Sequence, residues 1–231
     1  MKSIIVTGAS SGIGRATAKL FLANGWRVGL IARRVDVLKD MAEAHQNAVA
    51  LPADVTDAEA MAEAFEAFGA LDVLFNNAGI FGPSAPIDEI ALEDWQQVLS
   101  VNVHGMFVAA QLAFKQMRAQ GAGRIINNGS LSAHAPRPGS VCYTMTKHAI
   151  TGLTKSLSLD GRPYNIACGQ IDIGNAESQI VAALKEKNPN MDTMDVKHAA
   201  ASVLHMAEMP AQANVQFMTV MATKMPYIGR G

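Results

Sequence analysis

Short runs of apolar and β-branched residues alternate along the chain with longer stretches in which apolar residues recur every three or four positions. The short runs are typical of buried strands and the longer stretches of amphipathic helices. Strands are expected at 3–7, 27–32, 48–53, 71–79, 123–130, 164–169 and 215–221. Helices are expected at 13–24, around 35–42, from a cap at Thr56 or Asp57 to about 68, at 90–119 and 141–159, and as one or two segments within 176–208.

The regular alternation of strands and helices predicts an α/β fold. Parallel strands need crossover connections, and right-handed crossovers place helices on both faces of the sheet. No Pro/Ser-rich linker, charge run or internal repeat divides the chain. We therefore expect a single doubly wound domain over residues 1–231, with a region of substrate loops around 173–195.

Composition and charge narrow the possible partners. The 231 residues are 49% hydrophobic and 17% charged, which is enough for one large buried core. The formal net charge is −1 and no run of five basic residues occurs, so we expect no nucleic-acid or membrane-surface partner. No apolar stretch approaches the roughly eighteen residues of a membrane span. The only cysteines, Cys142 and Cys168, form no CxxC pair, so we expect no metal and a cytoplasmic protein.

The first strand runs into the glycine-rich sequence TGASSGIG at residues 7–14. Glycine permits a tight turn and lets backbone N–H groups approach a phosphate, and the start of the following helix carries partial positive charge. An ordinary glycine-rich turn is the alternative, but its place within a strand–helix–strand unit favours a dinucleotide site. The residues expected at this loop are Gly8, Ser10, Ser11, Gly12, Ile13 and Gly14.

The end of the second strand indicates which dinucleotide would bind. An acidic residue there selects the ribose 2′-hydroxyl of NAD, whereas arginine accommodates the 2′-phosphate of NADP. Arg33 and Arg34 occupy this position and the nearest acid, Asp36, comes later. We therefore expect NADP(H) in preference to NAD(H), unless the two arginines are only a solvated basic pair.

Several further motifs follow in order along the chain: ADV at 53–55, NNAG at 76–79, NVHG at 102–105, Ser130, and YTMTK at 143–147. With TGASSGIG, they resemble the classical short-chain dehydrogenase/reductase family over nearly the whole chain. The resemblance implies a single-domain Rossmann fold with about seven strands in the order 3-2-1-4-5-6-7. It also implies an NAD(P)-dependent oxidoreductase acting on a small carbonyl or alcohol substrate.

The family's functional residues can be carried over to matching positions. Its catalytic tetrad would be Asn102, Ser130, Tyr143 and Lys147. The family places its serine thirteen positions before the tyrosine, which selects Ser130 over Ser132. Further cofactor contacts would come from Asp54, Val55, Asn76, Ala78, Gly79, Gly169 and Ile171.

The tyrosine and lysine fit acid–base chemistry. A free phenol has a pKa near ~10, and a neighbouring cation lowers it. Lys147 stands four residues after Tyr143 on the expected helix, so the two can share a face. Ser130 would donate a hydrogen bond to the substrate oxygen, and the resemblance implies that Asn102 holds a relay water. A self-satisfied or solvent-facing amide is the alternative for Asn102.

The second half departs from the family pattern. The family's Pro-Gly followed by a threonine is here CGQIDIGNA at 168–176, where Cys168 replaces the proline and Ile173 or Gly174 the threonine. Side-chain support for the nicotinamide is therefore missing there. Phe81, Val141 and Ile173 are either an apolar substrate wall or plain core. His134 is expected on an exposed loop.

The sequence thus predicts an NADP-dependent carbonyl reductase or alcohol dehydrogenase. The alternatives are a catalytically idle NADP-binding regulator and an enzyme with lyase or isomerase chemistry on the same scaffold. The family's assemblies favour a homodimer through the long helices, or a homotetramer. A tetramer is less secure here because the C-terminal strand runs into TKMPYIGRG.

Overall fold

Seven parallel strands form one sheet in the computed structural model, which describes residues 1–231 apart from 179–180, 183–184, 187–188 and 229–231. Their order is β3-β2-β1-β4-β5-β6-β7, which confirms the predicted topology. The strands are β1 (Ser3–Thr7), β2 (Arg27–Ala32), β3 (Ala48–Pro52), β4 (Val73–Asn76), β5 (Gly123–Asn128), β6 (Ile166–Gly174) and β7 (Phe217–Met221). The order in which strands are added to the sheet reverses between β1 and β4, and ligands bind in the crevice at that point of such sheets.

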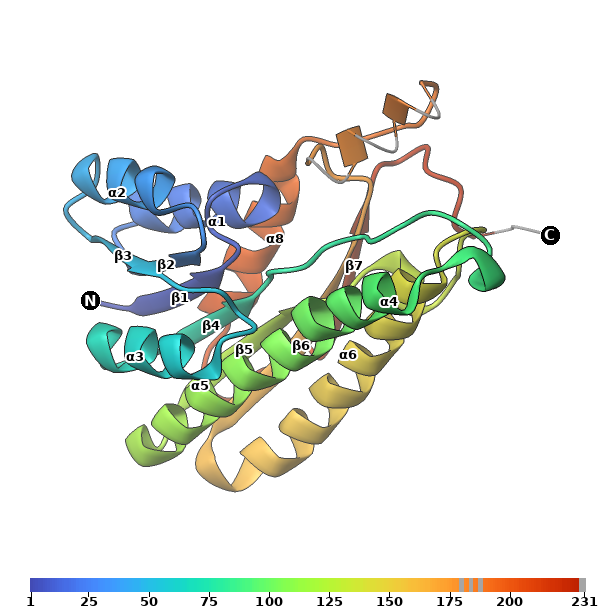
Figure 1. The fold of residues 1–231 in the computed structure, drawn as a ribbon. Coiled ribbons are helices and arrows are strands. Elements are labelled where there is room, and N and C mark those ends of the chain that lie inside the picture. Colours follow the sequence, from blue (N-terminus) through green and yellow to red (C-terminus); the bar gives the residue numbers. More distant parts are fainter. Residues whose placement is uncertain (179–180, 183–184, 187–188, 229–231) are drawn as a thin grey trace.

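Helices cover both faces of the sheet (Figure 1). The helices α1 (Gly12–Ala23), α2 (Val35–Glu43) and α8 (Val196–Glu208) lie on one face, and α3 (Ala58–Phe68), α5 (Met106–Gln120) and α6 (Val141–Gly161) on the other. Each face has its own core. Phe21, Leu30 and Val203 belong to the first core, and Phe65, Leu74 and Ile125 to the second.

The predicted helix over 90–119 contains a change of helical pitch. It comprises α4 (Leu92–Leu99), a π-helical segment (Ser100–Gly105) and α5. Leu92–Gln120 is also long and apolar enough, by length and composition, to cross a membrane, which the sequence analysis did not anticipate. Of its most apolar window, 44% is buried inside the protein, and Val108, Ala109, Ala113 and Met117 of α5 belong to the second core.

Element boundaries follow local signals in most places. Asp57 caps α3, accepting from the backbone N–H groups of Glu59 and Ala60. The helix α6 ends at Gly161, before the 3₁₀ turn Arg162–Tyr164, as the glycine and proline there predict. The strand β6 continues to Gly174, five residues beyond the expected end. The expected substrate-loop region, 173–195, lies partly outside the described residues.

Candidate active site

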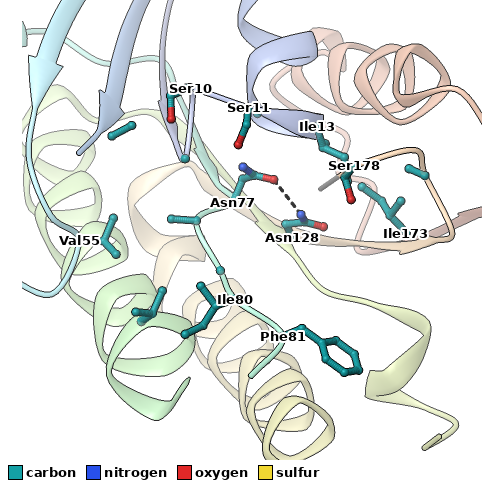
Figure 2. A pocket seen from close by; sticks show the side chains of 18 of the residues that line it. Ser10, Ser11, Ile13, Val55, Asn77, Ile80, Phe81, Asn128, Ile173 and Ser178 are labelled. Carbon is teal, nitrogen blue, oxygen red and sulfur yellow. Dashed lines mark hydrogen bonds between the residues drawn. The ribbon is translucent and has the colours of Figure 1, made fainter. Parts of the chain in front are cut away.

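A pocket of about 700 Å³ opens where the strands end, between the glycine-rich loop and α6. Figure 2 shows its lining from both sides of the sheet: Ser10, Ser11 and Ile13 above, and Ile80 and Phe81 below. Of the expected site residues, the lining contains Gly8, Ser10, Ser11, Gly12, Ile13, Gly14, Arg33, Arg34, Asp54, Val55, Ala78, Gly79, Tyr143 and Lys147. The sequence motifs that lie far apart in the chain therefore meet at one cavity.

The glycine-rich loop needs glycine for two separate reasons. Gly8 and Gly12 have φ of +69° and +51°, a region that L side chains rarely adopt. Gly14 packs so tightly that a Cβ atom would collide with the carbonyl oxygen of Gly8 and approach Asn77 Nδ2 to 2.7 Å. Ser11, the N-cap of α1, makes no side-chain capping bond. The backbone N–H groups in the first turn of α1 face the pocket. Because the Ser11 side chain does not bond them, they are available to a ligand.

Two arginines border the pocket at the end of β2. Arg34 donates from Nε and Nη2 to the hydroxyl of Ser10, at 3.1 and 3.0 Å. Arg33 is an exposed side chain whose Nη1 lies 3.7 Å from Asp54 Oδ2. Two positive charges and a hydroxyl therefore converge at this end of the cavity.

Five expected site residues do not line the pocket, and one of them, Asn102, is described below. Asn76 is buried, and its Nδ2 donates to the carbonyl of Met106 and to Asn127 Oδ1, so its neighbour Asn77 takes its place in the lining. Successive side chains of a strand point to opposite faces, which explains the exchange. Gly169 and Ile171 are interior residues of β6. The fourth is Ser130, which directly follows the lining residue Gly129.

Ser130, Tyr143 and Lys147 lie together at the β5–α6 side of the pocket. The Ser130 side chain hydrogen-bonds Tyr143 and accepts from the backbone N–H of Ser132 at 3.1 Å. The Lys147 ammonium is 2% exposed, lies 5.4 Å from the centre of the Tyr143 ring, and donates to the backbone carbonyl of Asn128 at 2.7 Å. The Phe81 ring lies 4.9 Å from the Tyr143 ring and forms an apolar wall beside it.

Burial dominates the protonation equilibria of this cluster. It raises the pKa of Tyr143, against the opposing effects of the Ser130 hydrogen bond and the Arg137 charge. It also lowers the pKa of Lys147 from 10.5 to about 8. We expected Lys147 to lower the pKa of Tyr143, but in this structure the net shift of the tyrosine pKa is upward. Tyr143 is therefore a protonated acid at neutral pH.

Asn102 lies in the π-helical segment and is fully buried. Its Oδ1 accepts from the N–H of Ile80 at 2.8 Å, and its Nδ2 donates to the Ile80 carbonyl at 2.8 Å and to Thr146 Oγ1 at 3.2 Å. Both amide protons are used, so this side chain fixes the pocket-lining segment after β4 and has no N–H left for a water. π-helical turns recur at functional sites, where they aim a side chain that an α-helix would place elsewhere.

Comparison with known proteins identifies the family. The family model described as short chain dehydrogenase matches residues 2–189. The chain belongs to the short-chain dehydrogenase family. It is 39% identical over 185 residues to 2-(R)-hydroxypropyl-CoM dehydrogenase of Xanthobacter autotrophicus, covering 75% of this chain and 74% of that protein. It is 34% identical to cis-4-hydroxycyclohexanecarboxylate dehydrogenase of Sinomonas cyclohexanicum, covering 78% and 75%.

A solved structure with similar architecture contains a nicotinamide cofactor. It is a variant of actinorhodin polyketide ketoreductase with NADPH, which superposes with a TM-score of 0.88 at 25% identity and covers 96% of each chain. The chain is thus an oxidoreductase of the short-chain dehydrogenase family, with a nucleotide-binding Rossmann fold.

This short-chain dehydrogenase contains a pair of a buried carboxylate and an exposed imidazole that the sequence did not reveal. Asp172 on β6 accepts from the backbone N–H of Ser130 at 2.9 Å and from Gln170 Nε2 at 2.7 Å. Its second oxygen lies 2.8 Å from Nε2 of His134, which is exposed, as expected. A Cβ atom at Gly129 would collide with the Asp172 carboxylate, so that glycine makes the approach possible. The signal in the sequence that could have indicated this pair was Asp172 itself, an acidic residue within a largely apolar strand.

The other residues that depart from the family pattern either pack in the core or line the pocket. Cys168 is buried among the core side chains, and burial raises the pKa of its thiol to about 12. Ile173 lines the pocket, as does Phe81, whereas Val141 lines a second, smaller hollow beside it. Ile173 offers an apolar surface where the family pattern has a threonine hydroxyl.

Proposed function

We propose that this chain is an NADP(H)-dependent oxidoreductase that transfers a hydride between the nicotinamide cofactor and a carbonyl or alcohol substrate, with Tyr143 as general acid and base. One observation carries the proposal. The Tyr143 hydroxyl, hydrogen-bonded to Ser130, and the buried Lys147 ammonium border the same cavity as a glycine-rich loop suited to phosphate.

The residues present fit a nicotinamide dinucleotide phosphate. Gly12, Ile13 and the first turn of α1 would hold the pyrophosphate. Asp54 and Val55 would border the adenine, and Lys147 the nicotinamide ribose. Arg33 and Arg34, with Ser10, would hold the 2′-phosphate, because guanidinium groups match phosphate oxygens. This positive end of the pocket favours NADP(H) over NAD(H).

The chemistry needs a proton at the carbonyl oxygen when hydride reaches the carbonyl carbon. The bound cofactor supplies the hydride, and the protein supplies orientation and the proton. Tyr143 donates its phenolic proton to the substrate oxygen, while Ser130 donates a hydrogen bond to the same oxygen and stabilises its developing charge. Because burial keeps Tyr143 protonated at neutral pH, its proton is available for transfer to a carbonyl oxygen. Lys147, through its ammonium, stabilises the phenolate that remains.

Assembly through the long helices is part of the proposal. Leu99 and Phe107, in the continuous segment of α4 and α5, have exposed fractions of 37% and 50%, and Met145 on α6 of 53%. Exposed apolar side chains on neighbouring helices favour a homodimer there. We propose a cytoplasmic setting on the basis of this family membership.

The test is to separate cofactor binding from turnover. NADPH binding is measured by its fluorescence, and a panel of ketones and alcohols is scored by consumption or formation of NADPH. Tyr143→Phe removes only the hydroxyl and is expected to lower turnover roughly 100- to 10,000-fold while NADPH binding persists. Tyr164→Phe is the matched control, because Tyr164 packs against Phe114 and Arg118 and does not border the pocket.

Two outcomes would contradict the proposal. Full activity of the Tyr143→Phe variant would exclude Tyr143 as the proton donor. Tight NADPH binding by the unmodified protein with no turnover of any carbonyl or alcohol would instead favour the catalytically idle regulator.

A further inference from the structure

Asn128, the last residue of β5, has one polar atom without a partner among the described residues. Its side chain is 8% exposed and belongs to the lining of the pocket. The Nδ2 group donates to Asn77 Oδ1 at 2.8 Å, but Oδ1 makes no hydrogen bond. A buried acceptor without a partner destabilises the protein, so such atoms are rare unless a ligand satisfies them.

The orientation of the Asn128 amide is fixed through Asn77 by the backbone carbonyl of Thr7. The carbonyl oxygen of Thr7 can only accept, so the Asn77 group that meets it at 2.9 Å must be the Nδ2 donor. The oxygen of Asn77 then faces Asn128, and the group that meets it must be the Asn128 donor. Asn128 Oδ1 is consequently the atom left over, and it lies on the side of the amide away from Asn77, in the direction of Ile173 (Figure 2).

The site therefore requires a hydrogen-bond donor. Phosphate oxygens are acceptors and would be repelled by Asn128 Oδ1. The backbone carbonyl of Asn128 accepts from Lys147 Nζ at 2.7 Å, which places this residue at the end of the pocket that holds the proton-transfer groups. Ile173, on the same wall, offers no polar atom of its own side chain.

We propose that Asn128 Oδ1 accepts a hydrogen bond from the nicotinamide half of the cofactor, either from the carboxamide N–H₂ or from a hydroxyl of the adjoining ribose. This inference rests on the proposed cofactor. In this arrangement the relay from Thr7 through Asn77 to Asn128 orients the reactive half of the cofactor from β5. A threonine on the β6 loop is then not required.

The test compares three ligands by isothermal titration calorimetry, so it does not depend on turnover. NADP⁺ carries both donors. Its 3-acetylpyridine analogue has a methyl in place of the amide nitrogen, and 2′-phospho-ADP-ribose lacks the nicotinamide but keeps the ribose. Asn128→Leu and the smaller Asn128→Val remove the acceptor, and thermal unfolding reports whether each variant folds. Asn24→Leu is the control, because the side-chain amide of Asn24 is exposed and donates a hydrogen bond to the Leu20 carbonyl.

Asn128→Leu and Asn128→Val are expected to weaken NADP⁺ binding roughly 5- to 20-fold, and Asn24→Leu to leave it unchanged. A loss confined to NADP⁺ identifies the carboxamide as the donor, and an equal loss for all three ligands identifies the ribose hydroxyl. Equal affinities of folded variants and unmodified protein for NADP⁺ would overturn the inference. So would a loss shared by NADP⁺ and the acetylpyridine analogue alone, which would indicate ring packing. Failure of the unmodified protein to bind NADP⁺ would instead refute the proposed cofactor.

Discussion

Nε2 of His134 lies 2.8 Å from Oδ2 of Asp172, and the Asp172 side chain is 1% exposed. The other oxygen of the same carboxylate accepts the backbone N–H of Ser130. The pair therefore connects a partly exposed imidazole to the backbone of the proposed catalytic serine. The Asp172 charge also raises the pKa values of Tyr143 and Lys147, because a negative charge disfavours the phenolate and favours the ammonium.

Replacing Asp172 with asparagine is expected to move the pH dependence of carbonyl reduction. The amide keeps an acceptor for the Ser130 N–H but loses the charge, so the pKa of Tyr143 falls. Tyr143 then loses its proton at a lower pH, and the alkaline limb of the kcat/KM profile shifts to lower pH. The measurement is the initial rate of NADPH oxidation across the pH range.

The Asp172→Ala variant serves as the comparison for this prediction. It removes both the charge and the acceptor that holds the Ser130 backbone, so we expect a lower kcat as well as the shifted limb. An alkaline limb that stays in place in a folded Asp172→Asn variant would show that the carboxylate charge does not reach Tyr143.

The choice between NADP(H) and NAD(H) is expected to depend on the arginines that follow β2. Arg33→Ala and Arg34→Ala each remove a charged donor near the proposed 2′-phosphate, so each should reduce the preference for NADPH over NADH by about 10- to 100-fold. The ratio of the two dissociation constants measures this. Arg15→Ala is the matched control, since Arg15 is exposed on α1 and outside the pocket lining. An unchanged ratio in both variants would refute the assignment of the phosphate.

The buried Lys147 is expected to lower the free energy of unfolding, although its ammonium serves the proposed reaction. Its pKa falls from 10.5 to about 8 on folding, so below pH 8 the folded state holds an ammonium that its surroundings disfavour. Each pKa unit corresponds to about 1.4 kcal/mol, and the lost bond to Asn128 offsets part of that gain. Lys147→Met should therefore unfold with a free energy about 1–3 kcal/mol higher at pH 7.

This gain should decrease with rising pH. Between pH 8 and 10.5 the unfolded chain holds the lysine proton and the folded chain does not, so the unmodified protein becomes relatively more stable. Urea unfolding of both proteins at pH 7 and pH 9.5 measures the difference. A gain that does not change between the two pH values would show that the charge of Lys147 is not its cause.

Two strands, β1 and β2, have the bounds that the sequence predicted, whereas the other five differ from their predicted bounds at one end or both. β1 and β2 begin and end where their runs of apolar residues do, because neighbouring strands and helices bury both strands. The end of β6 was not predictable. Its last residues include Gln170 and Asp172, whose polar side chains are buried only because Thr154, Ser130 and His134 satisfy them. A short-range pattern does not contain those distant partners.

The site was predictable as a set of residues but not in its detailed roles. The family resemblance selected Ser130, Tyr143 and Lys147, which the structure brings together. It could not distinguish Asn76 from Asn77. That choice depends on the direction in which each side chain points at the end of β4. It also gave no sign that the free oxygen of Asn128 is set by the carbonyl of Thr7, which precedes it by more than a hundred residues.

The π-helical segment Ser100–Gly105 makes the site sensitive to the number of residues in a helix. Deleting one residue there would allow an uninterrupted α-helix and remove the bulge that aims the side chains of this segment. Asn102 would then leave Ile80, and the tight packing of Gly105 against Val55 would be lost with it. A change of length by one residue, without any change of chemical type, would thus loosen both the proposed nicotinamide end and the proposed adenine end of the pocket.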